Sequence, residues 1–98
     1  MTMSDAAPED LETRRRRLKF RSWHRGMKEM DLILGHFADT ELEKLSPEEL
    51  DLYEELIELP DGELYNWITG RDKTPAEHDT PLFARIRSLK HMEEKMWR

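Results

Sequence analysis

The chain has 98 residues, of which 37% are hydrophobic and 39% are charged, and this composition describes one small domain with a polar surface. It has no cysteine, which excludes disulfides, thiolate metal sites and thiol nucleophiles. No stretch approaches the roughly 18 uninterrupted apolar residues of a membrane span. The formal net charge of −6 argues against a nucleic-acid-binding domain, since those are usually basic overall.

Charge is distributed unevenly near the N-terminus. Residues 1–10 are too acidic for a mitochondrial transit peptide and too polar for a secretory signal. We therefore predict a flexible acidic tail over residues 1–10 and a single domain over residues 11–98, in a cytoplasmic protein. The domain opens with the basic run Arg14 to Arg17, and this asymmetry is a first indication of a partner.

The first half of the domain has apolar residues at intervals of three and four, which predicts helices. The first helix is expected over residues 11–25. Its inward side chains are predicted to be Leu11, Leu18 and Trp23. A second helix is expected to begin near Gly26 or Met27, to bend at Gly35 and to continue weakly through Leu45. Its buried residues are predicted to be Met27, Met30, Ile33, Leu34 and Phe37.

A third helix has the clearest start signal, because Ser46, Pro47 and Glu49 stand at the positions of a capping box. It is expected to end at Leu59, before Pro60. The predicted buried stripe consists of Leu50, Tyr53, Leu56 and Ile57. The predicted solvated face consists of Asp51, Glu54, Glu55 and Glu58.

Two further helices complete the pattern. Asp61 is expected to cap a short helix that ends at Gly70 in the left-handed conformation, and Thr80 is expected to cap a last helix after a polar connection. The predicted inward residues of the last helix are Leu82, Phe83, Ile86, Leu89, Met92 and Met96. The sequence thus predicts an all-α fold, a compact bundle of about five short helices.

Residue patterns typical of catalysis are missing from the sequence. The four histidines have no HExxH spacing, there is no nucleophile elbow, and the four glycines form no phosphate-binding loop. We therefore predict a protein that is not an enzyme, with neither a catalytic site nor a metal site.

The segment Arg25-Gly26-Met27-Lys28-Glu29 is unusual because it places a glycine at a helix junction between opposite charges. Gly26 either turns the chain or offers bare backbone to another molecule, and the two roles are compatible. Together with Asp31, the two charged residues would rim a shallow patch suited to a complementary protein surface.

Two other regions are candidates for contact. Tyr65 and Asn66 follow the predicted start of the fourth helix, and aromatic residues of this kind are enriched at interfaces, although Trp67 beside them is expected in the core. The run Arg14 to Arg17 could bind phosphates, with Phe20 stacking on bases. A solvated helix face and a docking surface for an acidic protein are both better explanations of that run.

At these residues the chain resembles the succinate dehydrogenase assembly and flavinylation factor family, whose members share an RGxxE motif. Arg25 to Glu29 matches the motif, and Asp31 matches an acidic residue two places after it. Further along the chain, Leu45 to Glu49 matches the family's Leu-(Ser)-Pro-Glu-Glu helix start, and Asn66-Trp67 matches its Asn-Trp pair. The resemblance covers about Leu18 to Thr69. It implies a small helical bundle, which agrees with the fold predicted from periodicity.

The resemblance also implies a function, that of an assembly chaperone for the flavoprotein subunit of succinate dehydrogenase that promotes covalent attachment of FAD. Fumarate reductase is a second candidate client, FAD stays with the client and is not held firmly by this chain, and the free chain is expected to be a monomer. The partner-binding residues would be His24, Arg25, Gly26, Glu29, Asp31, Tyr65 and Asn66. The alternative is a nucleic-acid-linked regulator or antitoxin-like protein that acts through Arg14 to Arg17.

Overall fold

The computed structural model describes residues 10–88. The helices are α1 (Leu11–Trp23), α2 (Lys28–Glu41), α3 (Pro47–Ile57), α4 (Asp61–Ile68) and α5 (Pro81–Arg87), with 3-10 turns η1 (Leu42–Lys44) and η2 (Ala76–His78). No strand occurs in this range, and the prediction of an all-α bundle of about five short helices is confirmed. The predicted tail up to residue 9, and Leu89, Met92 and Met96 of the last helix, lie outside the described residues.

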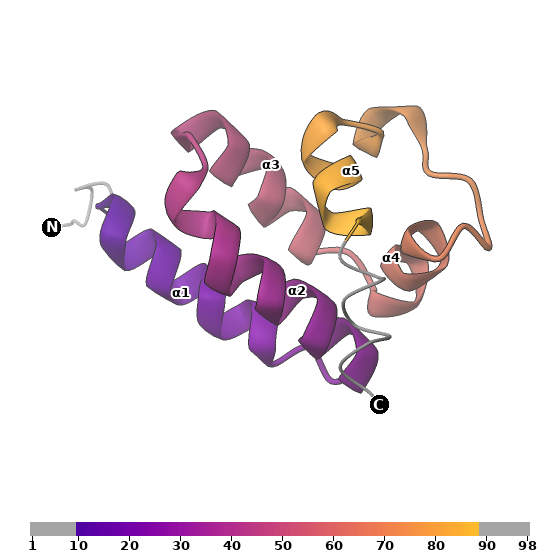
Figure 1. The fold of residues 1–98 in the computed structure, drawn as a ribbon, viewed down its shortest axis with the longest axis horizontal. Helices are drawn as coiled ribbons and strands as arrows, with labels where there is room; N and C mark the ends of the chain where they lie inside the picture. Colours follow the sequence, from indigo (N-terminus) through magenta and orange to yellow (C-terminus); the bar gives the residue numbers. More distant parts are fainter. Residues whose placement is uncertain (1–9, 89–98) are drawn as a thin grey trace, which may run out of the picture.

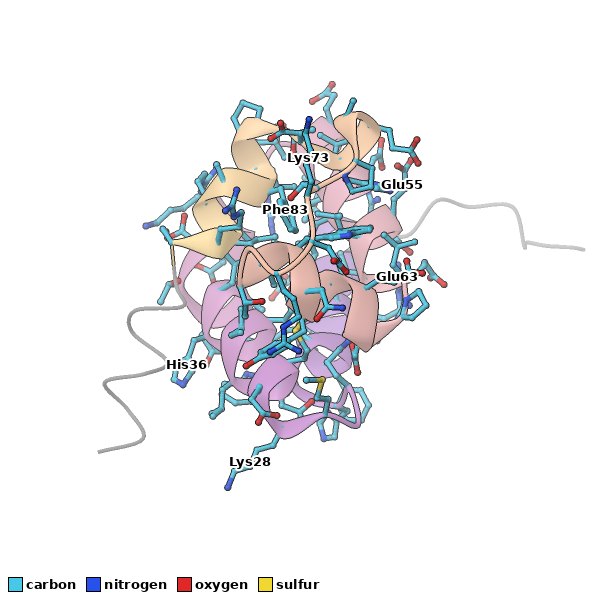
Figure 2. All side chains as sticks on the ribbon, turned by 90° about the vertical axis from the view of Figure 1, so that its right-hand side faces the viewer. Lys28, His36, Glu55, Glu63, Lys73 and Phe83 are labelled. Atoms are coloured by element: carbon cyan, nitrogen blue, oxygen red, sulfur yellow. The ribbon has the colours of Figure 1, made fainter. Side chains whose placement is uncertain are left out.

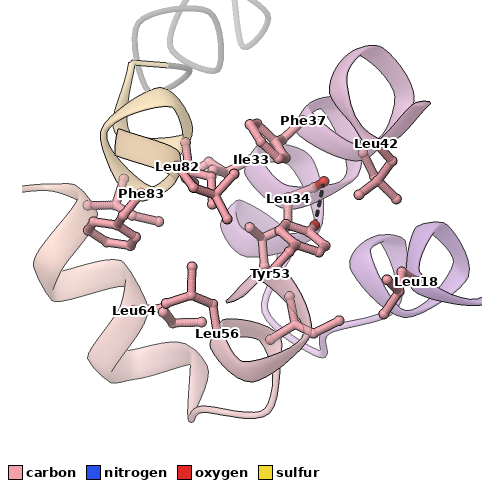
Figure 3. Packing of buried hydrophobic residues seen from close by; sticks show 14 of the residues in the cluster. Leu18, Ile33, Leu34, Phe37, Leu42, Tyr53, Leu56, Leu64, Leu82 and Phe83 are labelled. Carbon is pink, nitrogen blue, oxygen red and sulfur yellow. Dashed lines mark hydrogen bonds between the residues drawn. The ribbon is translucent and has the colours of Figure 1, made fainter. Parts of the chain in front are cut away.

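The helices are arranged around an antiparallel pair. α1 and α2 lie side by side, α3 packs against α1 and α5, and α4 stands at the end of the molecule where α1 turns into α2 (Figure 1). Tyr53 and Phe37 stack near the middle of the core, and Leu18 and Phe83 reach it from opposite ends of the chain (Figure 3). The predicted buried stripe of α3 is confirmed in full. No helix within residues 10–88 is both long and apolar enough to span a membrane.

Local start signals were predicted well. The Ser46 side chain accepts a hydrogen bond from the Glu49 N–H at 3.2 Å, and the Glu49 carboxylate accepts one from the Ser46 N–H at 2.9 Å. Thr80 caps α5 through the Phe83 N–H, and Gly70 ends α4 with φ +80°. These signals operate within a few residues, so the surrounding fold has little influence on them.

The expected bend at Gly35 is wrong, because α2 runs through it without interruption. Gly35 instead lies under the indole ring of Trp23, which occupies the space where a Cβ would stand. The indole N–H donates to Asp39 one turn further along α2. Gly35 therefore permits the close approach of α1 and α2.

The expected solvated acidic face of α3 is also partly wrong. Glu54 is half-buried and accepts hydrogen bonds from Arg14 and Arg17, while Asp51 pairs with Arg14 and Glu58 pairs with Arg21. Desolvation raises the pKa of Glu54, but the two arginines outweigh it and leave the pKa below its ordinary value. The acidic face of α3 is thus the docking surface for the basic face of α1.

Three predictions at helix ends are corrected. α1 ends at Trp23 and not at Arg25, because the chain turns there to place Arg25 against α3. Leu11 is 39% exposed, since only the later turns of α1 reach the core. Asp61 does not cap α4, whose N-cap is Pro60, because its carboxylate is used by Arg25.

Candidate functional site

Residues 24–27 join α1 to α2, and we call this connection the Gly26 turn. Gly26 has φ +98°, a conformation that residues with a side chain rarely adopt. A Cβ placed on Gly26 would meet no atom within 4 Å, so the backbone there is bare and open. Both roles that the sequence suggested for Gly26, a turn and an exposed backbone, are compatible with this geometry.

Arg25 is turned inward beside this open surface. Its side chain is 9% exposed, and its guanidinium donates to Asp61 Oδ1 at 2.8 Å, Ile57 O at 2.5 Å and Leu59 O at 3.0 Å. None of these bonds goes to Glu29, the other charged residue of the motif. Instead, Arg25 links the Gly26 turn to the connection between α3 and α4, where helical carbonyls lack partners of their own.

The carboxylates of Asp31 and Glu29 differ in whether they bond within the fold. Asp31 Oδ1 accepts a hydrogen bond from the Arg25 backbone N–H at 2.5 Å and so closes the Gly26 turn from within. Glu29 is half-buried in the first turn of α2, and its carboxylate has no hydrogen-bond or ion-pair partner within residues 10–88. Glu29 is therefore the member of this group that is available to another molecule.

An exposed aromatic pair borders the Gly26 turn on the α1 side. The imidazole of His24 stacks on the ring of Phe20 with centroids 4.0 Å apart, and its Nδ1 bonds to the Phe20 carbonyl. Phe20 is 63% exposed, so this ring contributes little to the core. His24 was predicted as a contact residue, whereas Phe20 was considered only for stacking on bases.

Tyr65 and Asn66 lie on α4, at the same end of the molecule as the Gly26 turn. Figure 2 looks onto this end, with Lys28 at the start of α2 below and Glu63 on α4 to the side. Tyr65 is half-buried against the core, one helical turn after Asp61. The Asn66 amide donates to Asp72 at 3.2 Å and so stabilises the loop after α4. Both side chains are half-buried, so neither projects freely.

The alternative use of Arg14 to Arg17 finds no support. Arg14 and Arg17 bond to acidic residues of α3, and Arg15 donates to the carbonyls of Leu42 and Leu45. Arg16 is largely exposed and lies 3.7 Å from Glu12. The basic run therefore serves to hold α1 in the bundle.

Sequence reasoning missed Asp61 as a member of this site. Its local position, directly after Pro60, suggested a helix cap, and no local pattern indicates a bond to a residue 36 positions away. No group of His, Asp and Glu side chains suited to a metal ion occurs in the part of the chain that is described. The open glycine, the unpaired carboxylate and the exposed ring pair together suit the recognition of another protein surface.

The fold and this site define a small all-helical protein-binding domain. The family model described as the flavinator of succinate dehydrogenase, Sdh5, matches residues 16–90, which include the whole Gly26 turn and α2 to α5. The chain belongs to this family, as the resemblance at Arg25 to Glu29 had predicted.

Individual relatives agree with the family match. The chain is 42% identical over 83 residues to the FAD assembly factor SdhE of Acetobacter pasteurianus, with 85% of this chain and 76% of that protein covered. It is 43% identical over 76 residues to the mitochondrial succinate dehydrogenase assembly factor 2-B of Drosophila mojavensis, with 76% and 48% covered. It is 37% identical over 73 residues to the mitochondrial assembly factor 2 of Dictyostelium discoideum, with 74% and 52% covered. The chain thus spans about half the length of these two mitochondrial relatives.

Proposed function

We propose that this chain is an assembly factor that binds the flavoprotein subunit of succinate dehydrogenase and promotes covalent attachment of FAD to it. The observation that carries the proposal is the family match over residues 16–90, which contains the Gly26 turn. The names of the relatives describe this role for those proteins. The open surface at Gly26 is the physical feature of this chain that fits it.

In this proposal the chain binds and does not catalyse. It would favour the client conformation in which the acceptor side chain and the flavin can react, because a ligand shifts an equilibrium toward the state that it binds more tightly. The flavin chemistry belongs to the client and its FAD. The chain itself supplies a contact surface and is not expected to hold FAD firmly.

Direct contact is assigned to Gly26 and Glu29, since one is bare backbone and the other is a carboxylate without an internal partner. The aromatic pair of Phe20 and His24 would extend this surface onto α1. The proposed partner-binding site as a whole, counting residues that touch the client and residues that support them, comprises His24, Arg25, Gly26, Glu29, Asp31, Tyr65 and Asn66.

We further propose that fumarate reductase is a second client and that the free chain is a monomer. A cytoplasmic location is part of the proposal, whereas several relatives carry a mitochondrial location in their names.

The test is to delete the gene and to measure flavin fluorescence in the flavoprotein subunit of the host's succinate dehydrogenase after denaturing electrophoresis. We expect protein-linked fluorescence to fall strongly and to return when the unaltered chain is supplied from a plasmid. A Glu29→Gln chain should restore it less well than a control chain with a change at the exposed Glu55. Normal flavin attachment in the deletion strain would show that the proposal is wrong.

A further inference from the structure

We infer that Arg25 and Asp61 are positioning residues that hold Gly26 and Glu29 in place for contact with the client. Asp61 thus works together with the RGxxE motif, although it lies 36 residues beyond Arg25 in the sequence. The inference rests on the proposed function and deepens it. It divides the motif into residues that touch the client, Gly26 and Glu29, and a residue that holds them in place, Arg25.

The geometry of the guanidinium is the first reason. Its three bonds converge on Ile57 O, Leu59 O and Asp61 Oδ1, all within a five-residue stretch that ends α3 and begins α4. The planar fork of arginine can bond to several acceptors at once, which the point charge of lysine cannot reproduce. At 9% exposure, the Arg25 side chain has little surface left for a client.

The backbone of Arg25 is the second reason. Its N–H is bonded to Asp31 in α2, while its side chain is bonded to the connection between α3 and α4. Residue 25 is therefore held from two sides, and Gly26 follows it directly. The position of the Gly26 backbone relative to α4 depends on these bonds.

The burial of Asp61 is the third reason. The Asp61 side chain is 17% exposed and makes no capping hydrogen bond in α4, and its carboxylate accepts instead from the Arg25 guanidinium at 2.8 Å. A charged pair this far out of water is retained only with good geometry and additional hydrogen bonds, and removing one partner leaves the other uncompensated. Arg25 and Asp61 should accordingly act as one unit.

A double-mutant cycle on client binding tests this. The affinity of purified chain for the purified flavoprotein subunit is measured for the unaltered chain, Arg25→Ala, Asp61→Ala and the double variant, at a temperature at which thermal melts show all four folded. We expect each single variant to bind about tenfold more weakly and the double variant to bind no worse than either single one. If an alanine variant does not fold, Arg25→Lys and Asp61→Asn replace it in the same cycle.

The Arg21–Glu58 pair is a matched control. This neighbouring ion pair joins α1 to the residue that follows α3, at 2.8 Å, but both of its side chains are more exposed, at 32% and 62%. Glu58→Ala should leave the affinity for the flavoprotein within about twofold of the unaltered chain. An equal loss for Glu58→Ala and Asp61→Ala would overturn the inference, since the loss would then not be specific to the bond between Arg25 and Asp61.

Two readouts separate positioning from direct contact. Positioning predicts that Asp61→Asn shifts the amide NMR resonances of Gly26 and Glu29 in the free protein. It also predicts that the affinity lost in Arg25→Ala is the same at low and high salt, whereas an ion pair with the client would be screened. Additive losses in the cycle, unmoved resonances or a loss that shrinks with salt would each overturn the inference. Failure of the unaltered chain to bind the flavoprotein would overturn the proposed function instead.

Discussion

The indole ring of Trp23 lies directly on the backbone of Gly35 and fills the space where a side chain on that residue would begin. The contact lets α1 and α2 approach closely near the Gly26 turn. His36, the next residue along α2, meets the edge of the same ring with centroids 5.1 Å apart. The orientation of the two helices that carry the contact surface therefore depends on the absence of one methyl group.

Gly35→Ala should destabilise the domain. Alanine favours helix by about 1 kcal/mol relative to glycine, but displacing the indole should cost about 1–3 kcal/mol, so we expect a net loss in the free energy of unfolding. Urea denaturation measures it. Gly62→Ala is the matched control, because Gly62 is also helical and a Cβ there meets nothing within 4 Å, so that variant should be neutral or slightly stabilised. Equal stability of the two variants would contradict the close approach.

Gly26→Leu should weaken binding to the flavoprotein subunit while leaving the helix content nearly unchanged. Gly70→Leu is the control, since Gly70 also has a positive φ and open space around it. Both changes should cost about 1–2 kcal/mol of stability through backbone strain. Only the Gly26 variant should lose affinity in a titration, because only there does the new side chain cover the contact surface. Equal affinities for the two variants would remove Gly26 from the interface.

Tyr53 should make the domain sensitive to alkali. Burial raises the pKa of its phenol above the ordinary value near 10, although the hydrogen bond with Ser22 lowers it in part. Above pH 10 the unfolded chain loses this proton while the folded chain keeps it. The free energy of unfolding should therefore fall with rising pH, by up to about 1.4 kcal/mol per unit from this group.

Tyr53→Phe isolates that effect. At pH 8 the variant should be about 1 kcal/mol less stable, because it lacks the 2.5 Å hydrogen bond to Ser22. The difference from the unaltered chain should shrink as the pH rises above 10, since the variant has no phenol to ionise. Denaturation curves at several pH values measure it, and a difference that stays constant would show that the phenol does not contribute.

Glu54 should contribute stability that disappears in acid. Its pKa is lowered in the fold because Arg14 and Arg17 outweigh the opposing effect of burial. The contribution is therefore present above the unfolded value near 4.5 and is lost as the pH falls through the lower folded value. At pH 7, Glu54→Gln should cost about 1 kcal/mol, and less in high salt.

Glu55→Gln is the control for that prediction. Glu55 is exposed and forms no ion pair or hydrogen bond with its side chain in the described part of the chain, so this change should be nearly neutral. Denaturation at pH 7 and at pH 3 compares the two variants. A Glu54→Gln variant that is as destabilised at pH 3 as at pH 7 would argue against the ionic contact between α1 and α3.

Much of the fold follows from local patterns. The Ser46 capping box, the Thr80 cap, the Gly70 terminus and the buried stripe of α3 were all predicted, because each depends on residues within one or two helical turns. The sequence predictions failed where a residue distant in the sequence bonds to a side chain that local pattern had assigned elsewhere. Asp61 has the residue type and position of a helix cap, but its carboxylate bonds to Arg25. Glu54 stands on the side of α3 that the sequence predicts to face solvent, but arginines of α1 pair with it.

The candidate site shows the same division. The sequence alone predicted the all-α fold and singled out the junction at Arg25 to Glu29, because helical periodicity and glycine conformation are local properties. Only the tertiary structure decided that Arg25 and Asp31 bond within the fold, while Gly26 stays open and the Glu29 carboxylate has no partner within residues 10–88. The physical reason is that a charged side chain bonds to whichever partner the fold brings nearest, and for Arg25 that partner is 36 residues away.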